Sequence, residues 1–313
     1  MNLQIHGLQG IKRINTAEEE WTMKISKDIK LRLVGVGKVG MSIAQAFAQS
    51  GFRIHGTDVS QEIIDKGLKK VEQNLVSLVS KGKISAEEKD AALSRMQFSK
   101  ELEIVRDADV VVEAIFEDMN IKKETFKKLD KLVASKEALL LTNTSSLSIS
   151  EIASVTKRPE RVAGMHFFNP VPVMKLVEVV RGVLTSSETI DKVKELAKLM
   201  GKTPIVSADS PAFIVNRLLN ALACEAARIV EEGVGAVEDV DTGAKLGLGH
   251  PMGPFELFDF LNGIPLLLHV ADYMAQELGD RFRMPVWVKN IVKAGMTGRE
   301  TGRGFYDYSK KEK

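Results

Sequence analysis

The chain has 313 residues, 44% hydrophobic and 27% charged, which is enough for two domains that each bury a core. Its 44 basic and 42 acidic residues leave a net charge of +2, which argues against a nucleic-acid-binding surface. No stretch approaches the roughly 18 apolar residues that a membrane span requires. The single cysteine, Cys224, excludes an internal disulfide and fits a reducing compartment. We expect a cytoplasmic protein with no nucleic-acid, membrane or metal partner.

Residues 1–28 carry no apolar core of the kind found in export signals, and the acidic run AEEE at 17–20 also argues against export. The first fifteen residues contain no acid, so a mitochondrial targeting segment stays open as an alternative. We interpret 1–28 as a flexible extension.

Between Lys30 and about Ser207, short β-branched runs alternate with polar amphipathic stretches. Strands are predicted at 30–35, 52–57, 109–115, 138–142, 161–167 and 174–180, and helices at 38–50, 60–81, 85–95, 119–134, 148–155 and 187–200. Two of these helices begin with sequences typical of capping boxes, Ser85 with Glu88 and Ser148 with Glu151. Such alternation with apolar strands predicts a parallel sheet covered on both faces.

The pattern changes near residue 208. Ser210 followed by Pro211 predicts a helix start, with a cap and a proline at the first helical position. Helices are expected from there to Gly233 and then at about 237–246, 254–260, 265–277 and 285–294. The first of these is apolar on several sides, which favours either a homodimer interface or complete burial within one chain. We therefore expect an all-helical domain at 208–313.

A glycine-rich turn follows the first predicted strand. Gly35, Gly37 and Gly40 form the pattern G-x-G-x-x-G at the start of a helix, and Asp58 ends the second strand. In a dinucleotide-binding turn these glycines permit a tight bend, a close approach of the backbone to the pyrophosphate, and close packing of the helix on the strand. The acid accepts hydrogen bonds from the ribose hydroxyls. Asp58 would repel a 2′-phosphate, so NAD is favoured over NADP. The fold class is α/β, a Rossmann-type doubly wound sheet at 29–207 followed by the smaller all-α domain. A turn without a ligand is the alternative.

A bound nicotinamide needs a partner that moves a proton while the hydride moves. His166 ends a predicted strand at the carboxyl edge of the sheet, where ligands of such folds bind. Glu178 interrupts an otherwise apolar strand, and a buried carboxylate needs a partner. A histidine paired with a carboxylate suits a general base.

Further polar residues are expected at the same edge. Asn143, Ser145 and Ser146 follow a buried strand, and Asn216 interrupts the apolar face of the first helix after residue 208. Asn216 is either a cleft residue or a polar residue of helix packing.

The run "NTSSLSISEIA" and the later "HFFNPVPVMKLVEVV" resemble the 3-hydroxyacyl-CoA dehydrogenase family, which includes 3-hydroxybutyryl-CoA dehydrogenases. The segments "VVVEAIFEDMNIKKETFKKLD", "GHPMGPFELFD" and "TGRGFYDY" are similar to it as well, so that the likeness covers about 30–308. It implies reversible NAD-dependent oxidation of an L-3-hydroxyacyl-CoA, with an acyl-CoA substrate and a homodimer. The family shows Gly-Leu-Asp where this chain reads "LNGIP", a departure in which Pro265 can start the next helix.

The resemblance also implies roles for individual residues. His166 matches the catalytic histidine and Glu178 its partner acid, while Ser145 matches the serine that contacts the substrate hydroxyl and Asn216 the asparagine that completes the site. The residues expected near the nicotinamide are Glu117, Lys122, Asn143 and Asn169, and those expected near the CoA moiety are Asn74 and Lys81.

Two other functions stay open. One is a dehydrogenase of the L-gulonate type, a relative with the same plan that acts on a free sugar acid but lacks the "HFFNPVPVMK" motif. The other is a dinucleotide-binding protein without activity, as in some lens crystallins, which predicts damage to the histidine, serine and asparagine set. That set is complete in this sequence.

Overall fold

A computed structural model describes residues 23–261 and 263–309. Most of the extension expected at 1–28 lies outside these residues. Its described part is packed against the domain that follows, because Ile25 is buried in the core of that domain. The carbonyl of Met23 also accepts a hydrogen bond from Lys192.

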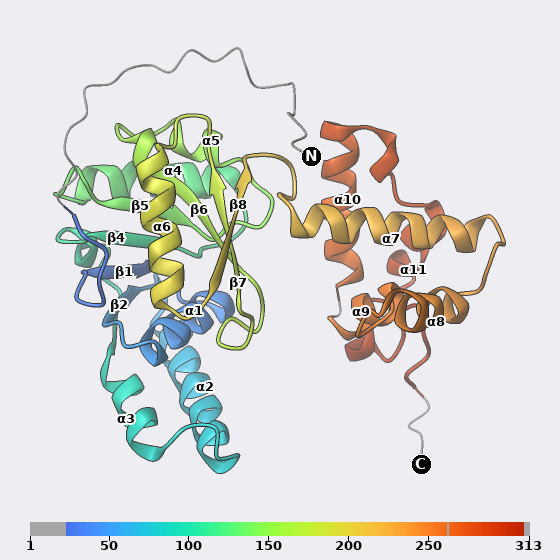
Figure 1. The fold of residues 1–313 in the computed structure, drawn as a ribbon, viewed down its shortest axis with the longest axis horizontal. Coiled ribbons are helices and arrows are strands. Elements are labelled where there is room, and N and C mark those ends of the chain that lie inside the picture. The colour runs from blue at the N-terminus through green and yellow to red at the C-terminus, as the bar shows by residue number, and fades with distance from the viewer. Residues whose placement is uncertain (1–22, 262, 310–313) are drawn as a thin grey trace, which may run out of the picture.

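The first domain is an α/β unit (Figure 1). Its strands are β1 (Leu31–Val34), β2 (Ile54–Thr57), β3 (Met96–Ser99), β4 (Val110–Glu113), β5 (Leu139–Thr142), β6 (Val162–Phe167), β7 (Leu176–Arg181) and β8 (Thr203–Ala208). Its helices are α1 (Lys38–Gln49), α2 (Gln61–Ser80), α3 (Ala86–Ser94), α4 (Met119–Leu132), α5 (Ile149–Ala153) and α6 (Ser187–Leu199). Short 3₁₀ turns lie at Leu102–Val105 and Pro159–Arg161.

The strands form one sheet in the order β3-β2-β1-β4-β5-β6-β7-β8. Its first six positions follow the doubly wound order that binds dinucleotides, so the predicted fold class is confirmed. The parallel sheet expected from the alternation has one exception, because β6 and β7 are antiparallel. Residues 168–175, which join them, are too few for the crossover of about a dozen residues that a parallel pair needs.

Two strands lie outside the predicted set. β3 is short and pairs with β2, and β8 pairs with β7 at the other edge of the sheet. Pro204 lies within β8, where an edge strand tolerates a residue without an N–H group.

Helices cover both faces of the sheet. Apolar residues of α1, α2 and α6 share one core with the sheet, and apolar residues of α4 and α5 share a second core on the opposite face. In Figure 1, α6 crosses the front of the sheet, and α2 and α3 extend away from it.

Helix starts follow local sequence. Ser85 and Glu88 form the predicted capping box at α3. At α5 the prediction is half right, because Ser148 caps the helix while the carboxylate of Glu151 pairs with Lys123 instead.

The second domain contains α7 (Val215–Glu231), α8 (Val237–Leu248), α9 (Pro254–Phe260), α10 (Ile264–Leu278) and α11 (Val286–Lys293). Single 3₁₀ turns lie at Asp280–Phe282 and Arg299–Thr301. Cys224 is buried in its core, as expected for a packing residue, and Pro265 stands in the first turn of α10. Within the described ranges, none of the helices is long and apolar enough to cross a bilayer.

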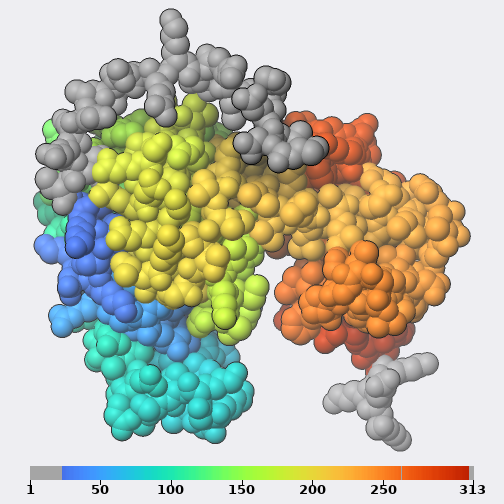
Figure 2. All heavy atoms as spheres, in the orientation of Figure 1, coloured from blue at the N-terminus to red at the C-terminus, as the bar shows by residue number. Residues whose placement is uncertain are grey.

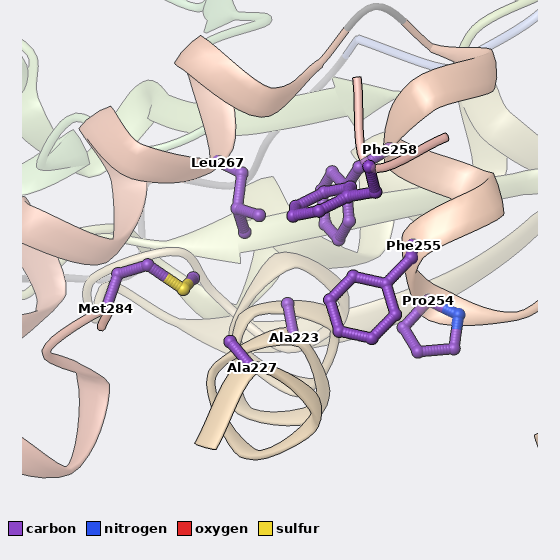
Figure 3. Close-up of a pocket in the computed structure, with 8 residues that line it drawn as sticks. Ala223, Ala227, Pro254, Phe255, Phe258, Leu267 and Met284 are labelled. Atoms are coloured by element: carbon purple, nitrogen blue, oxygen red, sulfur yellow. The ribbon is translucent and has the colours of Figure 1, made fainter. Parts of the chain in front are cut away.

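Figure 3 shows apolar side chains of α7, α9 and α10 converging in this core. The ring of Phe255 also contacts those of Trp287 and Phe305. The side chains around this point leave no room for a water molecule, so they form a packed core.

Residues 209–214 join the two domains, and here the predicted helix start at Ser210 and Pro211 is wrong. The chain first turns through Ala212 and Phe213, whose φ angles of 62° and 52° are left-handed, and α7 begins at Val215. The N–H groups of Ile214 and Val215 donate hydrogen bonds to Glu178, so the turn places the start of α7 against the edge of the sheet. Figure 2 shows the surface hollowed between the domains beside this connection.

Candidate active site

The glycine turn has the geometry that a dinucleotide requires. Gly35 has a φ of 87°, and a Cβ atom there would lie 2.7 Å from the carbonyl oxygen of Ala114. A Cβ atom on Gly40 would lie 2.0 Å from the carbonyl oxygen of Gly35, so neither position accepts a side chain. At Gly37 no described residue beyond its two chain neighbours comes within 4 Å of the missing Cβ, which leaves the backbone open at the start of α1.

The start of α1 is also electrically suited to an anion. Gly37 precedes the helix, and none of the side chains that the structure describes caps it. The first N–H groups of a helix have no partner within the helix and carry partial positive charge. The turn therefore fits a pyrophosphate, which such helix starts bind.

Asp58 lies at the end of β2, beside this turn. Its Oδ2 accepts a hydrogen bond from the N–H of Val36 at 2.9 Å, and its Oδ1 accepts from the N–H of Ser60 at 3.4 Å. Both contacts fix the carboxylate next to the glycines, where an adenosine ribose is held in folds of this kind.

His166 and Glu178 face each other across the ladder that joins β6 and β7. The Nδ1 atom of His166 lies 2.8 Å from Oε2 of Glu178, and both side chains are buried. A carboxylate only accepts, so Nδ1 carries the proton, and in the neutral imidazole Nε2 then has a free lone pair. Within the described residues no hydrogen bond engages Nε2.

The other oxygen of Glu178 is used as well. Oε1 accepts the N–H groups of Ile214 and Val215 at 2.9 Å and 3.0 Å. These groups belong to the start of α7, so the positive end of the helix meets the carboxylate. The rings of Phe168 and Phe213 lie beside the imidazole, at 4.5 Å and 5.9 Å between centroids.

The polar residues after β5 lie at the same edge. Asn143 ties this strand to its neighbour, because its Oδ1 accepts the N–H of Phe167 at 2.9 Å. The carbonyl oxygen of Ser145 accepts a hydrogen bond from Nδ2 of Asn216 at 3.4 Å. Ser146 is buried, and its hydroxyl lies 3.5 Å from Oε1 of Glu117. The structure thus brings together residues of both domains that are 71 positions apart.

Glu117 and Lys122 form an ion pair next to this loop, with Nζ 3.3 Å from Oε2. Sequence reasoning missed a third member, Glu113, whose Oε1 lies 2.7 Å from the same Nζ. Glu113 closes an otherwise apolar strand, which is the same signal that singled out Glu178.

Three expected residues lie apart from this cluster. Asn74 and Lys81 are exposed, Asn74 within α2 and Lys81 directly after it, and Nδ2 of Asn74 donates to Gln45 at 3.3 Å. They are seven positions apart, about two helical turns, and so face the same side. Asn169 is exposed in the loop after β6.

The fold and this site define an NAD-dependent oxidoreductase with a nucleotide-binding domain and a helical domain. Residues 30–210 match the family "3-hydroxyacyl-CoA dehydrogenase, NAD binding domain", and residues 213–308 match "3-hydroxyacyl-CoA dehydrogenase, C-terminal domain". The chain belongs to the 3-hydroxyacyl-CoA dehydrogenase family.

Individual relatives agree with this assignment. A 3-hydroxybutyryl-CoA dehydrogenase of Clostridioides difficile is 45% identical over 283 residues, which cover 90% of this chain and 100% of the relative. The mitochondrial hydroxyacyl-coenzyme A dehydrogenase of Sus scrofa is 39% identical over 88% of this chain and 90% of its own. The crystal structure of an (S)-3-hydroxybutyryl-CoA dehydrogenase from Ralstonia eutropha is similar with a TM-score of 0.86 and 40% identity, and covers 90% of this chain and 99% of that one.

Proposed function

We propose that His166 is the general base of a reversible oxidation that converts an L-3-hydroxyacyl-CoA into the 3-ketoacyl-CoA. The observation that carries this proposal is the hydrogen bond between Nδ1 of His166 and Oε2 of Glu178, which leaves Nε2 as a base at the carboxyl edge of the sheet. The names of the relatives make a four-carbon acyl group the first substrate to test.

In the oxidation, Nε2 of His166 takes the proton of the C3 hydroxyl as the C3–H bond breaks. Bound NAD⁺ supplies the acceptor for the hydride that leaves C3. The resulting imidazolium lies against the carboxylate of Glu178, which stabilises its charge. In the reverse direction the same imidazolium returns the proton to the alkoxide oxygen.

Ser145 and Asn216 hold the reacting end of the substrate. Their mutual hydrogen bond joins the loop after β5 to the first turn of α7. The Ser145 hydroxyl donates to the substrate oxygen, and Asn216 completes the site from the helical domain. Both therefore stabilise charge that develops on that oxygen.

The sheet edge that contains the glycine turn would hold the cofactor. Gly35, Gly37 and Gly40 form its pyrophosphate site, and Asp58 accepts hydrogen bonds from the ribose hydroxyls. The carboxylate repels a 2′-phosphate and so selects NAD over NADP. The nicotinamide half is held by Glu117, Lys122, Asn143 and Asn169.

The CoA moiety lies toward α2. Asn74 and Lys81 are exposed on one side of this helix and at its end, and the lysine ammonium suits a phosphate group. Both assignments rest on the resemblance to the family.

We also propose a homodimer that forms through the helical domain. This domain exposes large apolar side chains, among them Leu218, Leu246, Leu248, Leu266 and Val286. Large exposed apolar patches are typical of protein interfaces, and we infer that these side chains form one. We place the enzyme in the cytoplasm, where its free thiol, Cys224, stays reduced.

The test of the activity is the loss of NADH absorbance when acetoacetyl-CoA is added to the purified chain. We expect oxidation of NADH, much slower oxidation of NADPH, and no reduction of NAD⁺ with L-gulonate. Binding of NADH without turnover on acetoacetyl-CoA would refute the proposed substrate. Reduction of NAD⁺ by L-gulonate would instead support the sugar-acid alternative.

A further inference from the structure

Glu113 and Lys122 form an ion pair that is fully enclosed in the protein. Their side chains are 0% and 1% exposed, and Nζ lies 2.7 Å from Oε1. Two charges removed from water are costly unless their geometry is good and their other hydrogen bonds are made.

The carboxylate of Glu113 also accepts hydrogen bonds from groups other than Lys122. Its Oε1 also accepts the N–H of Ile115 at 2.7 Å, and its Oε2 accepts the hydroxyl of Thr142 at 2.7 Å. The carboxylate is therefore held by β5 and by its own chain as well as by Lys122. These contacts explain how a carboxylate persists at the end of a strand with three buried valines.

The ammonium of Lys122 also contacts a second carboxylate. Nζ of Lys122 lies 3.3 Å from Oε2 of Glu117, whose side chain is 36% exposed. Two carboxylates thus share one ammonium, so this cluster of three side chains carries one net negative charge. Glu117 is its exposed end and Glu113 its buried end.

Glu117 connects the cluster to the loop after β5. Its Oε1 accepts the N–H of Ser145 at 3.1 Å and a short hydrogen bond from the Thr144 hydroxyl. Thr142, which donates to Glu113, accepts the N–H of Thr144 at 3.2 Å. A continuous set of hydrogen bonds therefore runs from the buried carboxylate to the loop that carries Ser145.

We propose that Glu113 is a positioning residue that gives this cluster its net negative charge and thereby makes the site prefer the oxidised cofactor. The inference rests on the proposed function, in which Glu117 and Lys122 hold the nicotinamide half. The nicotinamide ring is positively charged in NAD⁺ and neutral in NADH. A net negative cluster beside it stabilises NAD⁺ selectively, because charges interact strongly where water is largely excluded.

The test compares the dissociation constants of NAD⁺ and NADH, measured by titration calorimetry on the full chain without substrate. The variant Glu113→Gln keeps the shape and most hydrogen bonds but removes the charge. We expect the ratio of the NAD⁺ dissociation constant to the NADH dissociation constant to rise about tenfold, the effect of one unit charge about 12 Å away at an effective dielectric near 20. The matched control is Glu124→Gln, which removes an exposed charge from α4, the helix that carries Lys122, and should leave the ratio unchanged.

A second variant keeps the proposal testable if Glu113→Gln does not fold. Glu117→Gln makes the same change of charge at the exposed end of the cluster and should shift the ratio in the same direction. The inference would be overturned if the ratio of the two dissociation constants were unchanged in whichever of these two variants folds. Weaker binding of NAD⁺ and NADH by the same factor would count as an unchanged ratio. Failure of the wild-type chain to bind either cofactor would instead refute the proposed function.

Discussion

Glu178 lies directly opposite His166 in the antiparallel pair of β6 and β7, and its carboxylate is 2.8 Å from the imidazole. Residues that are directly opposite in such a pair point to the same face with Cβ atoms about 4.5–5.5 Å apart. The reversal of strand direction after β6 therefore brings the side chains of His166 and Glu178 together. The remaining oxygen of Glu178 binds the start of α7, so one carboxylate orients the imidazole of His166 and anchors the helix of Asn216.

The substitution Glu178→Gln should lower kcat by about 10²–10⁴-fold, the range that a positioned base contributes. The amide NH₂ group would face Nδ1 as a donor and force the proton onto Nε2, so that Nε2 could no longer accept the substrate proton. Oxidation of L-3-hydroxybutyryl-CoA by NAD⁺ and binding of NADH should be measured together. Glu195→Gln on α6 is the control, since that carboxylate is exposed. A kcat equal to that of the control would contradict the role of the pair.

The substitution Asn216→Ala should lower kcat/KM by about 10²-fold, because it removes a donor next to the oxygen on which charge develops. NADH binding should not change, since Asn216 lies on the helical domain. Steady-state kinetics with varied acetoacetyl-CoA measures the effect, and Asn290→Ala on the exposed side of α11 is the control. A normal kcat/KM would show that Asn216 only packs against the loop.

The substitution Asp58→Asn should reduce the preference for NADH over NADPH by about tenfold or more. The amide oxygen still accepts the N–H of Val36, so the glycine turn stays in place, but the charge that repels a 2′-phosphate is gone. A hydrogen bond to a charged group contributes about 1.5–3 kcal/mol, so NADH should also bind more weakly. The ratio of kcat/KM for the two cofactors is the measurement, with Asp65→Asn on α2 as the control. An unchanged ratio would mean that another residue selects the cofactor.

The helical domain should lose stability in alkali through Tyr306. Burial, and then the hydrogen bond that its hydroxyl donates to Asp241 at 2.7 Å, raise the pKa of Tyr306 above its ordinary value. A group whose pKa is raised on folding stabilises fully below its unfolded pKa, about 10 for tyrosine, and this contribution is lost as the pH rises further. Thermal midpoints between pH 8 and 11 should fall for the wild type.

The matched variant for this effect is Tyr306→Phe. It should be less stable at pH 8 by about 1–2 kcal/mol, since Asp241 loses a hydrogen bond, and its midpoint should fall less steeply above pH 10. If the thermal midpoint of Tyr306→Phe fell with pH as steeply as that of the wild type, groups other than Tyr306 would cause the loss of stability in alkali.

Most of the fold could be predicted from periodicity. The predicted strands and helices of the first domain lie within a few residues of the observed ones, and so do the helices after α7. The direction of β7 could have been predicted as well, because residues 168–175 are too few for a crossover. The short strand β3 and the edge strand β8 have no strong apolar pattern, since neither forms the centre of the sheet.

Features that depend on tertiary contacts could not be predicted. Ser210 and Pro211 are a good local start for a helix, but Glu178 binds the amides of Ile214 and Val215 and fixes the start of α7 further along. The role of Glu113 depends on Lys122, which approaches from α4. A buried carboxylate can be noticed in a sequence, but its partner is known only once the strands and helices are placed.

We expect His166 to act in the chemical step, as the base, and not in cofactor binding. The most direct test measures NADH oxidation by acetoacetyl-CoA and the NADH dissociation constant for the wild type and His166→Ala. We expect kcat to fall by about 10²–10⁴-fold in the variant while the dissociation constant stays within about twofold. A variant that keeps its turnover, or that loses NADH affinity in the same proportion, would contradict it.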